Sequence, residues 1–407
     1  MSNFKFDIKN IKDKINYAKQ LLSRNDLSPI ERERIKHSLI AYYAILDSSD
    51  SVYNRIITPF LDKISNGKYS SNIDSNRLCK TGDILLDKDS YGLLTKDYLQ
   101  VLINLASKIQ KPQIESTKFE EMSFSDVDLK NITLSFYKSL DSEMEDIINK
   151  IISTPGLVNV TEYRTAKNID GVTFYDYIEN VPFVNVSRAG TIEDAQVFAH
   201  ELMHATDFVM QPKYYDSNYY GFHETPTYCN DLLFADFMES NGIDSNEVNK
   251  IRSERINYIR GLAYQALFQI RSKIGRETFM SGDINSIYNA VDEDILKKLL
   301  EVQSGIMAVG LYTQIKHNKE NGINNLKTFM SNMIPKTNTP DFSKIGLDYN
   351  TLMKICENIK TYGFDFGGYN LENEIYSEHV DFTEREYSDR VESLRSRWNE
   401  KRSKLWI

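Results

Sequence analysis

The sequence predicts a mainly α-helical protein with one small β-sheet. Apolar residues recur at helical spacing over long stretches, as in residues 31–46. Runs rich in Val, Phe and Tyr are confined to one region, between residues 157 and 187. A helix-start signal follows at Thr191, and helices are expected from there to about residue 335. The chain has 407 residues, enough for two or three domains or one large body.

The part of the chain before the sheet is expected to be helical, with one irregular segment. Ser28 and Glu31 form a capping box, and Pro29 stands at the first helical position. Ser, Asn, Asp and Gly are frequent at 65–92, which predicts irregular structure there. Further helices are expected at 94–109 and, as one or two helices, between residues 125 and 152.

Three strands are expected next, at 157–163, 172–177 and 181–187, with Gly171 and Pro182 as punctuation. The helices that follow should end at a loop, and a charged helix should close the chain. The later segments are the loop at 335–343, a helix at 349–360 and a turn-rich break at 363–369. The expected division is an N-terminal helical region at 1–112, a central catalytic region at 113–362 and a C-terminal extension at 363–407.

Charge and composition exclude several classes of protein. The net charge is -9, which argues against nucleic acid as the main partner, because phosphate binding needs a basic surface. There are three cysteines, with no pair at CxxC spacing, which favours a reducing compartment over a disulfide framework. The N-terminus has no apolar signal-peptide core, and no run has the roughly 20 apolar residues of a membrane span. A cytoplasmic protein without a membrane span is therefore expected.

The pattern His200-Glu201-Leu202-Met203-His204 is the strongest chemical signal in the sequence. Residues four apart lie on one face of a helix, about one turn from each other. Two imidazoles placed in this way can bind one zinc ion, and Glu201 can reach a water molecule beside that ion. The sequence therefore predicts His200 and His204 as ligands of one Zn²⁺ ion and Glu201 as a general base.

A catalytic zinc site needs a third protein ligand, and Glu224 is the candidate. It lies 20 residues after His204, at the start of a predicted second helix that would fold back as a hairpin. The neighbouring His223 is a rival ligand, although it would point elsewhere on a helix. Two further carboxylates, Asp207 and Asp231, are candidates to accept the spare N–H of a ligand imidazole.

These residues predict a zinc-dependent endopeptidase. The metal would activate a water molecule, Glu201 would take its proton, and the same proton would pass to the leaving amine. No covalent intermediate is needed, so the cysteines need no catalytic role.

Two long stretches of the sequence resemble the oligoendopeptidase F and thimet oligopeptidase family of zinc metallopeptidases. The run VPFVNVSRAGTIEDAQVFAHELMHATDF is similar to that family's strand and zinc helix. The run FHETPTYCNDLLFADFM is similar to its third-ligand helix. The similarity covers residues 115–360 approximately and is most specific at 181–237.

This resemblance implies a two-lobed helical fold with a substrate channel and zinc at the channel floor. It implies short, unfolded peptides as substrates. The strand at 181–187 would pair with the substrate backbone by strand addition. The candidates for substrate contact are Val184, Asn185, Val186 and Gly190.

The sequence departs from the family at several positions. Met203 stands where the family usually has Gly, and Asp207 stands where a third His is frequent. No His or Tyr lies ahead of the run QSGIMAVG, where the family has residues that stabilise the tetrahedral intermediate. The donor to the oxyanion is therefore not identified, and four tyrosines are candidates: Tyr258, Tyr264, Tyr288 and Tyr312.

Two alternatives remain at this point. One is a peptide-binding protein that retains zinc without turnover, which the missing His and Tyr residues suggest. The other is a thermolysin-like enzyme, which the gap between His204 and Glu224 would suit. Its third-ligand helix, however, should carry an Asp four residues after the Glu, where this chain has Tyr228.

Overall fold

The computed structural model of this chain describes residues 11–27, 31–32, 35, 38–39, 41–42, 95–111, 119–163, 171–210, 222–332 and 342–362. Three predicted features lie outside these residues: the capping box at Ser28, the irregular segment at 65–92 and the C-terminal helix. The same holds for most of the loop predicted at 335–343 and for the extension at 363–407.

The described residues form mostly helices and one small sheet, which confirms the predicted fold class. The first elements are α1 (Ile11–Leu22), α5 (Lys96–Ile109), α6 (Asp126–Leu140) and α7 (Ser142–Ser153). The strands β1 (Val158–Tyr163), β2 (Gly171–Asp176) and β3 (Val181–Arg188) follow, and then α8 (Glu193–Met210) and α9 (Glu224–Ser240). The remaining elements are α10 (Ser245–Ile274), α11 (Arg276–Met280), α12 (Ile284–Ala290), α13 (Glu293–His317), α14 (Lys319–Asn332), the 3₁₀ turn η4 (Ser343–Ile345) and α15 (Tyr349–Tyr362).

Local side-chain caps explain where several helices begin. Ser125 and Asp128 form a capping box at the start of α6. Asp141 ends α6 in an extended conformation, and its carboxylate accepts hydrogen bonds from the first amides of α7. The segment between residues 125 and 152 is therefore two helices, which resolves the predicted alternative of one or two.

The strand–helix junction before α8 is closed by two local contacts. The hydroxyl of Thr191, where the sequence predicts a helix start, accepts a hydrogen bond from the amide of Glu193. The carboxylate of Asp194 accepts hydrogen bonds from the amides of Ala189 and Gly190. These contacts fix the direction in which α8 leaves the sheet.

The sheet has the strand order β1-β3-β2, so β3 is its central strand. β3 pairs in parallel with β1 and antiparallel with β2, and its residues are buried from Val181 to Ser187. The predicted strand addition of a substrate to 181–187 is therefore wrong for its central residues, because Val184, Asn185 and Val186 pair with β1 on one side and with β2 on the other. Within the described residues, β1 and β2 are both edge strands of this sheet, and β2 is an edge strand that packs against α8.

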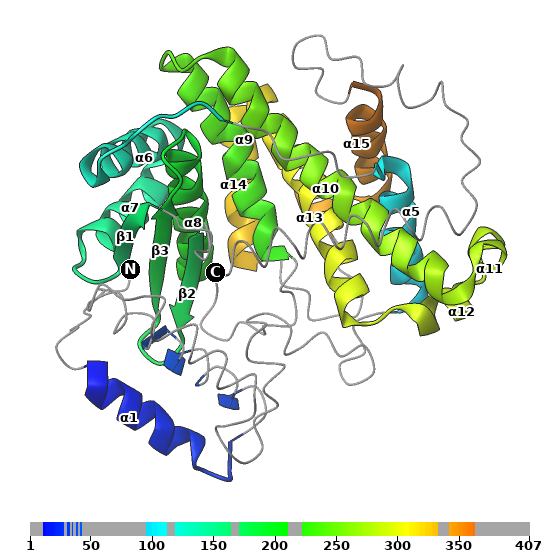
Figure 1. The fold of residues 1–407 in the computed structure, drawn as a ribbon, viewed down its shortest axis with the longest axis horizontal. Coiled ribbons are helices and arrows are strands. Elements are labelled where there is room, and N and C mark those ends of the chain that lie inside the picture. Colours follow the sequence, from blue (N-terminus) through cyan, green and yellow to red (C-terminus); the bar gives the residue numbers. More distant parts are fainter. Residues whose placement is uncertain are drawn as a thin grey trace.

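The helices lie in a row that extends away from the sheet (Figure 1). α6, α7 and α8 lie beside the strands, and α5, α11, α12 and α15 lie at the opposite end. α9, α10 and α13 run between these two groups and pack against one another, and α9 also packs against α8. This arrangement packs α10 and α13 against α9, which in turn packs against the helix that carries the HELMH motif.

A close approach of α10 and α13 fixes the spacing of these two helices. Gly305 of α13 faces Ile259 of α10, and a Cβ atom at Gly305 would lie 2.4 to 2.9 Å from three side-chain carbons of Ile259. A glycine at position 305 therefore allows the close approach of the two helices, and no positive φ angle requires it. Isoleucine is a stiff, β-branched neighbour that cannot easily rotate away.

The structure also shows the length of the apolar helices and the state of two cysteines in the described part of the chain. None of its helices is both long and apolar enough to span a membrane. Cys229 and Cys356 are unpaired and buried, whereas Cys79 lies outside the described residues.

We expect Gly305→Ala to lower the free energy of unfolding by about 1–3 kcal/mol, because the added methyl overpacks the α10–α13 contact. Urea denaturation followed by circular dichroism measures this change. The double variant Gly305→Ala/Ile259→Ala provides the control, because the smaller residue 259 leaves room for the methyl. Its loss of stability should be less than the sum of the two single losses. Additive losses would contradict this account of the contact.

Candidate metal centre

Helix α8 presents His200 and His204 on the face that packs against α9. The two rings lie one helical turn apart, with their centroids 4.9 Å from each other. Both side chains are largely buried. The apolar residues Phe198, Ala199, Leu202 and Met203 are fully buried and anchor this part of the helix in the core.

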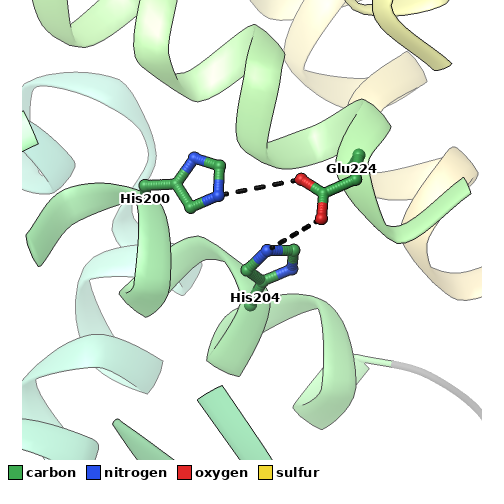
Figure 2. A group of neighbouring side chains, drawn as sticks. All are labelled: His200, His204 and Glu224. Carbon is green, nitrogen blue, oxygen red and sulfur yellow. Dashed lines mark ion pairs between the residues drawn. The ribbon is translucent and has the colours of Figure 1, made fainter. Parts of the chain in front are cut away.

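Glu224 is the first residue of α9, and its carboxylate points back to α8 (Figure 2). One carboxylate oxygen lies 3.7 Å from Nε2 of His200, and the other lies 3.6 Å from Nε2 of His204. The hydroxyl of Thr227, one turn further along α9, donates a hydrogen bond of 3.0 Å to this carboxylate. The three residues predicted as metal ligands therefore converge in the structure.

The donor atoms of this group fit a zinc ion. One ligand atom from each residue lies within 4.8 Å of the others, and this is the group of that kind found among the described residues. Two ligands that each lie about 2.0–2.1 Å from one tetrahedral zinc ion stand roughly 3.4 Å apart. The observed nitrogen–oxygen separations are close to this value. Two imidazoles and one carboxylate also leave the fourth position open, as a catalytic site requires.

The pKa values of the two imidazoles are shifted in opposite directions because their neighbours differ. Burial lowers the pKa of His204 to about 3, so this ring is neutral and can act as a ligand. Burial also disfavours the charged form of His200, but the adjacent carboxylates of Asp231 and Glu224 outweigh it and raise the pKa of His200. The carboxylate of Asp231 lies 3.1 Å from Nδ1 of His200, which favours a proton on that nitrogen and leaves Nε2 facing Glu224.

Two carboxylates were predicted to hold a ligand imidazole. Asp231 contacts the predicted ligand His200, whereas Asp207 contacts His223. Asp207 contacts Nδ1 of His223 at 2.7 Å. His223, the rival ligand, is thus paired outside the metal-ligand group. The acid that supports His200 stands seven residues after Glu224, and not four as in the thermolysin-like pattern.

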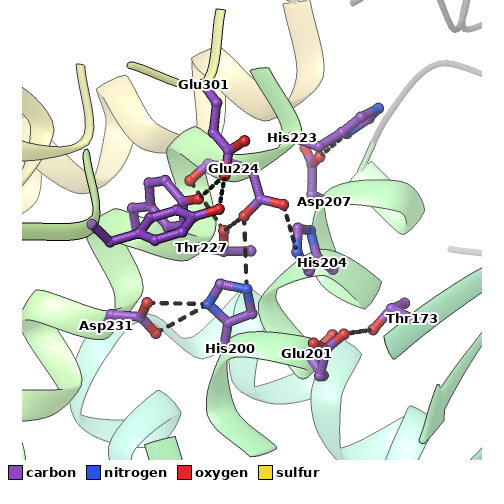
Figure 3. A network of polar contacts seen from close by, with 12 residues as sticks. Thr173, His200, Glu201, His204, Asp207, His223, Glu224, Thr227, Asp231 and Glu301 are labelled. Atoms are coloured by element: carbon purple, nitrogen blue, oxygen red, sulfur yellow. Dashed lines mark hydrogen bonds and ion pairs between the residues drawn. The ribbon is translucent and has the colours of Figure 1, made fainter. Parts of the chain in front are cut away.

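Glu201 is buried beside the two histidines and is held by strand β2. The hydroxyl of Thr173 donates to the Glu201 carboxylate at 2.7 Å and lies 2.8 Å from its backbone carbonyl. Figure 3 shows the carboxylate turned toward Thr173. A Cβ atom at Gly171 would lie 2.8 Å from one carboxylate oxygen, so this glycine leaves the room that the side chain occupies. Burial raises the pKa of Glu201 to about 7, in the range of a general base.

A second polar group lies on the other side of Glu224. Tyr228 and Tyr258 both donate to the same oxygen of Glu301, at 2.6 and 2.9 Å. Burial and the nearby charge of Glu224 raise the pKa of Glu301. The guanidinium of Arg255 stacks over the ring of Tyr228, 4.2 Å from its centroid. These four residues come from α9, α10 and α13.

The four tyrosines predicted as candidate oxyanion donors lie in different surroundings in the structure. Tyr258 lies in the group just described. Tyr264 stacks on Phe268, Tyr288 lies under Lys96, and Tyr312 donates to Asp236. Sequence reasoning missed Tyr228, Glu301, Arg255 and Thr173 as parts of the site. The signal for Tyr228 was present, because it lies one helical turn after Glu224 on the same face.

The four predicted substrate contacts are occupied within the chain itself. Val184, Asn185 and Val186 lie in the paired central strand, and the side chain of Asn185 accepts a hydrogen bond from Asn159. Gly190 donates its amide to Asp194 and accepts from the amide of Met122. Their backbone groups are therefore not available to a peptide in this structure.

The chain resembles several solved structures. No protein-family model matches it, and no curated protein matches it. A Bacillus anthracis str. Ames protein assigned as an oligoendopeptidase F is 12% identical with a TM-score of 0.44, covering 88% of this chain and 75% of that one. PZ peptidase A with inhibitor 2 is 12% identical with a TM-score of 0.42, covering 84% and 67%. A Chlamydophila abortus protein assigned as a peptidase is 16% identical with a TM-score of 0.40, covering 87% and 63%.

These solved structures are described as peptidases, and the first bears the name of the family that the sequence resembles. Every TM-score is below 0.5, so the function proposed below rests on the geometry of the site.

We expect the full-length chain to bind one zinc ion and to be stabilised by it. At free zinc 100 times above the dissociation constant, the gain in unfolding free energy is about 2.7 kcal/mol. Elemental analysis and thermal denaturation with and without a chelator measure the two effects. His204→Ala and Glu224→Ala should lose the ion, whereas His317→Ala, at an exposed histidine of α13, should retain it. Equal zinc content in all four proteins would rule out this centre.

Proposed function

We propose that this chain is a zinc-dependent endopeptidase that hydrolyses short, unfolded peptides. The observation that supports it most is the convergence of His200, His204 and Glu224 with a buried carboxylate, Glu201, beside them on α8. Three ligands with an open fourth position are typical of catalytic zinc, whereas structural zinc sites are closed by four protein ligands.

A zinc ion bound by these three residues would supply a Lewis acid that polarises the peptide carbonyl and makes water more acidic. The chain's own residues supply the remaining chemistry. Glu201 accepts a proton from the attacking water and later donates it to the amide nitrogen that leaves. Thr173 holds the Glu201 carboxylate by a hydrogen bond, so that the base does not have to be ordered during each turnover.

The edge of β2 is the proposed place for the substrate backbone. β3, the strand first expected to bind the peptide, is paired on both sides. β2 packs against α8 and contacts Glu201 through Thr173, so a peptide added to its outer edge would lie along the candidate base. Tyr258, on the other side of Glu224, is the remaining tyrosine candidate for stabilising charge on the substrate oxygen.

We expect Glu201→Gln to reduce kcat by at least about 100-fold, because the amide cannot accept the proton. Zinc content should not change, since Glu201 is not a ligand. Hydrolysis of a quenched fluorescent peptide library gives kcat, and elemental analysis gives the metal content. Glu320→Gln, at an exposed glutamate of α14, serves as control. Full activity in Glu201→Gln would exclude Glu201 as the base.

The same assay separates the proposed function from its alternative. Wild-type cleavage that a chelator abolishes would exclude a zinc-retaining binding protein. Zinc uptake and peptide binding without any cleavage would instead favour that binding protein over the endopeptidase.

A second variant tests the role of β2 in placing the base. Gly171→Ala would put a methyl group against Cγ and one carboxylate oxygen of Glu201, so the carboxylate must move. We expect a decrease in kcat of about 10-fold or more with unchanged zinc content, because small displacements of a catalytic group are costly. The kcat and metal measurements described above apply. Wild-type kcat in Gly171→Ala would contradict this placement.

A further inference from the structure

We infer that Arg255 is a positioning residue of the metal centre, which acts on His200 through Asp231. The inference rests on the proposed function, because it concerns the affinity of the same site for zinc. Arg255 belongs to α10, Asp231 to α9 and His200 to α8. These three residues lie far apart in the sequence, and the packing of the three helices brings them into contact.

The contacts form a continuous chain from the guanidinium to the ligand imidazole. Nη2 of Arg255 lies 2.5 Å from one oxygen of Asp231. The same oxygen lies 3.1 Å from Nδ1 of His200, and the second oxygen lies 3.2 Å from it. Asp231 is 1% exposed, so solvent does not hold its carboxylate in place. Arg255 and His200 together therefore set its orientation.

Charge gives Arg255 a specific task in this chain of contacts. A zinc ligand must be a neutral imidazole, and a neutral His200 leaves the buried carboxylate of Asp231 without a full positive charge on that side. Within the described residues, Arg255 is the Arg or Lys within ion-pair distance of Asp231. An unpaired buried carboxylate is strongly unfavourable. Loss of Arg255 would therefore release Asp231 from the geometry in which it orients His200.

The aromatic neighbours explain why the cation is an arginine. Its guanidinium lies 4.2 Å from the ring centroid of Tyr228 and 5.9 Å from that of Tyr258. A planar guanidinium can stack on these rings and still direct one nitrogen at Asp231, whereas a lysine ammonium is a point charge on a flexible stem. Tyr228 and Tyr258 in turn donate hydrogen bonds to Glu301. Arg255 therefore lies between these two fixed rings and the carboxylate of Asp231.

The test is the zinc dissociation constant of the full chain, measured by competition with a chelating dye. We expect Arg255→Met and Asp231→Asn each to weaken zinc binding by about 10–100-fold, the range seen when a group that supports a ligand is lost. The double variant should bind zinc no more weakly than Asp231→Asn alone, because Arg255 acts through that residue. Additive losses in the double variant would overturn the inference.

Arg252 offers a matched control on the same helix. It is also largely buried and ion-paired, to Asp236 and Glu239, but these residues lie outside the metal-ligand group. Arg252→Met should lose stability and keep the wild-type zinc affinity. A loss of affinity equal to that of Arg255→Met would show a general effect of stability and would overturn the inference.

Two further measurements cover the case in which Arg255→Met does not fold. Arg255→Lys keeps the charge but loses the stacking, so its zinc affinity should lie below that of the wild type. The visible spectrum of the cobalt-substituted protein should change in Arg255→Lys and not in Arg252→Met. Wild-type affinity and an unchanged spectrum in Arg255→Lys would overturn the inference about Arg255 and leave the proposed function standing. A wild-type chain without zinc would overturn the proposed function as well.

Discussion

The carboxylate of Glu224 between two imidazoles is the contact on which the site depends. Each of its oxygens faces one ring nitrogen, and this requires α9 to begin beside the middle of α8. Core contacts enforce that position. Tyr137 of α6 and Asn230 of α9 both donate to the backbone carbonyl of Ala199, next to the first histidine. Three helices therefore meet at one peptide group, and the ligand geometry follows from their packing.

Local pattern was enough to predict part of the site. The spacing of His200 and His204 is set by the pitch of one helix, and Asp231 lies two turns after Glu224 on the same face. Glu224 itself was predicted as an acid at the start of a second helix that folds back on the first. The strand order was not predictable in this way, because a buried run such as 181–187 reads the same at the centre or the edge of a sheet. Arg255 and Glu301 were missed because charged residues in long helices usually face solvent, and nothing in the local sequence marks these two as buried.

The polar residues of the site form two groups that share Glu224. On one side are Glu201 and Thr173, which link α8 to β2. On the other side are Tyr228, Tyr258 and Glu301, with Arg255 stacked between the rings and Asp231. Carboxylates outnumber cations here, and burial together with the negative charge of Glu224 raises the pKa of Glu301. A divalent cation is the natural complement to this excess of negative charge.

The double use of β2 has a consequence for how such a protein can diverge. Gly171 and Thr173 shape the surroundings of Glu201 from the same strand whose outer edge is proposed to receive the peptide. Substitutions that retune peptide preference along this strand would therefore also disturb the proton-transfer group. Under the proposed function, residues of α10 and α13, which lie on the opposite side of Glu224, can change without disturbing Glu201 or its hydrogen bond to Thr173.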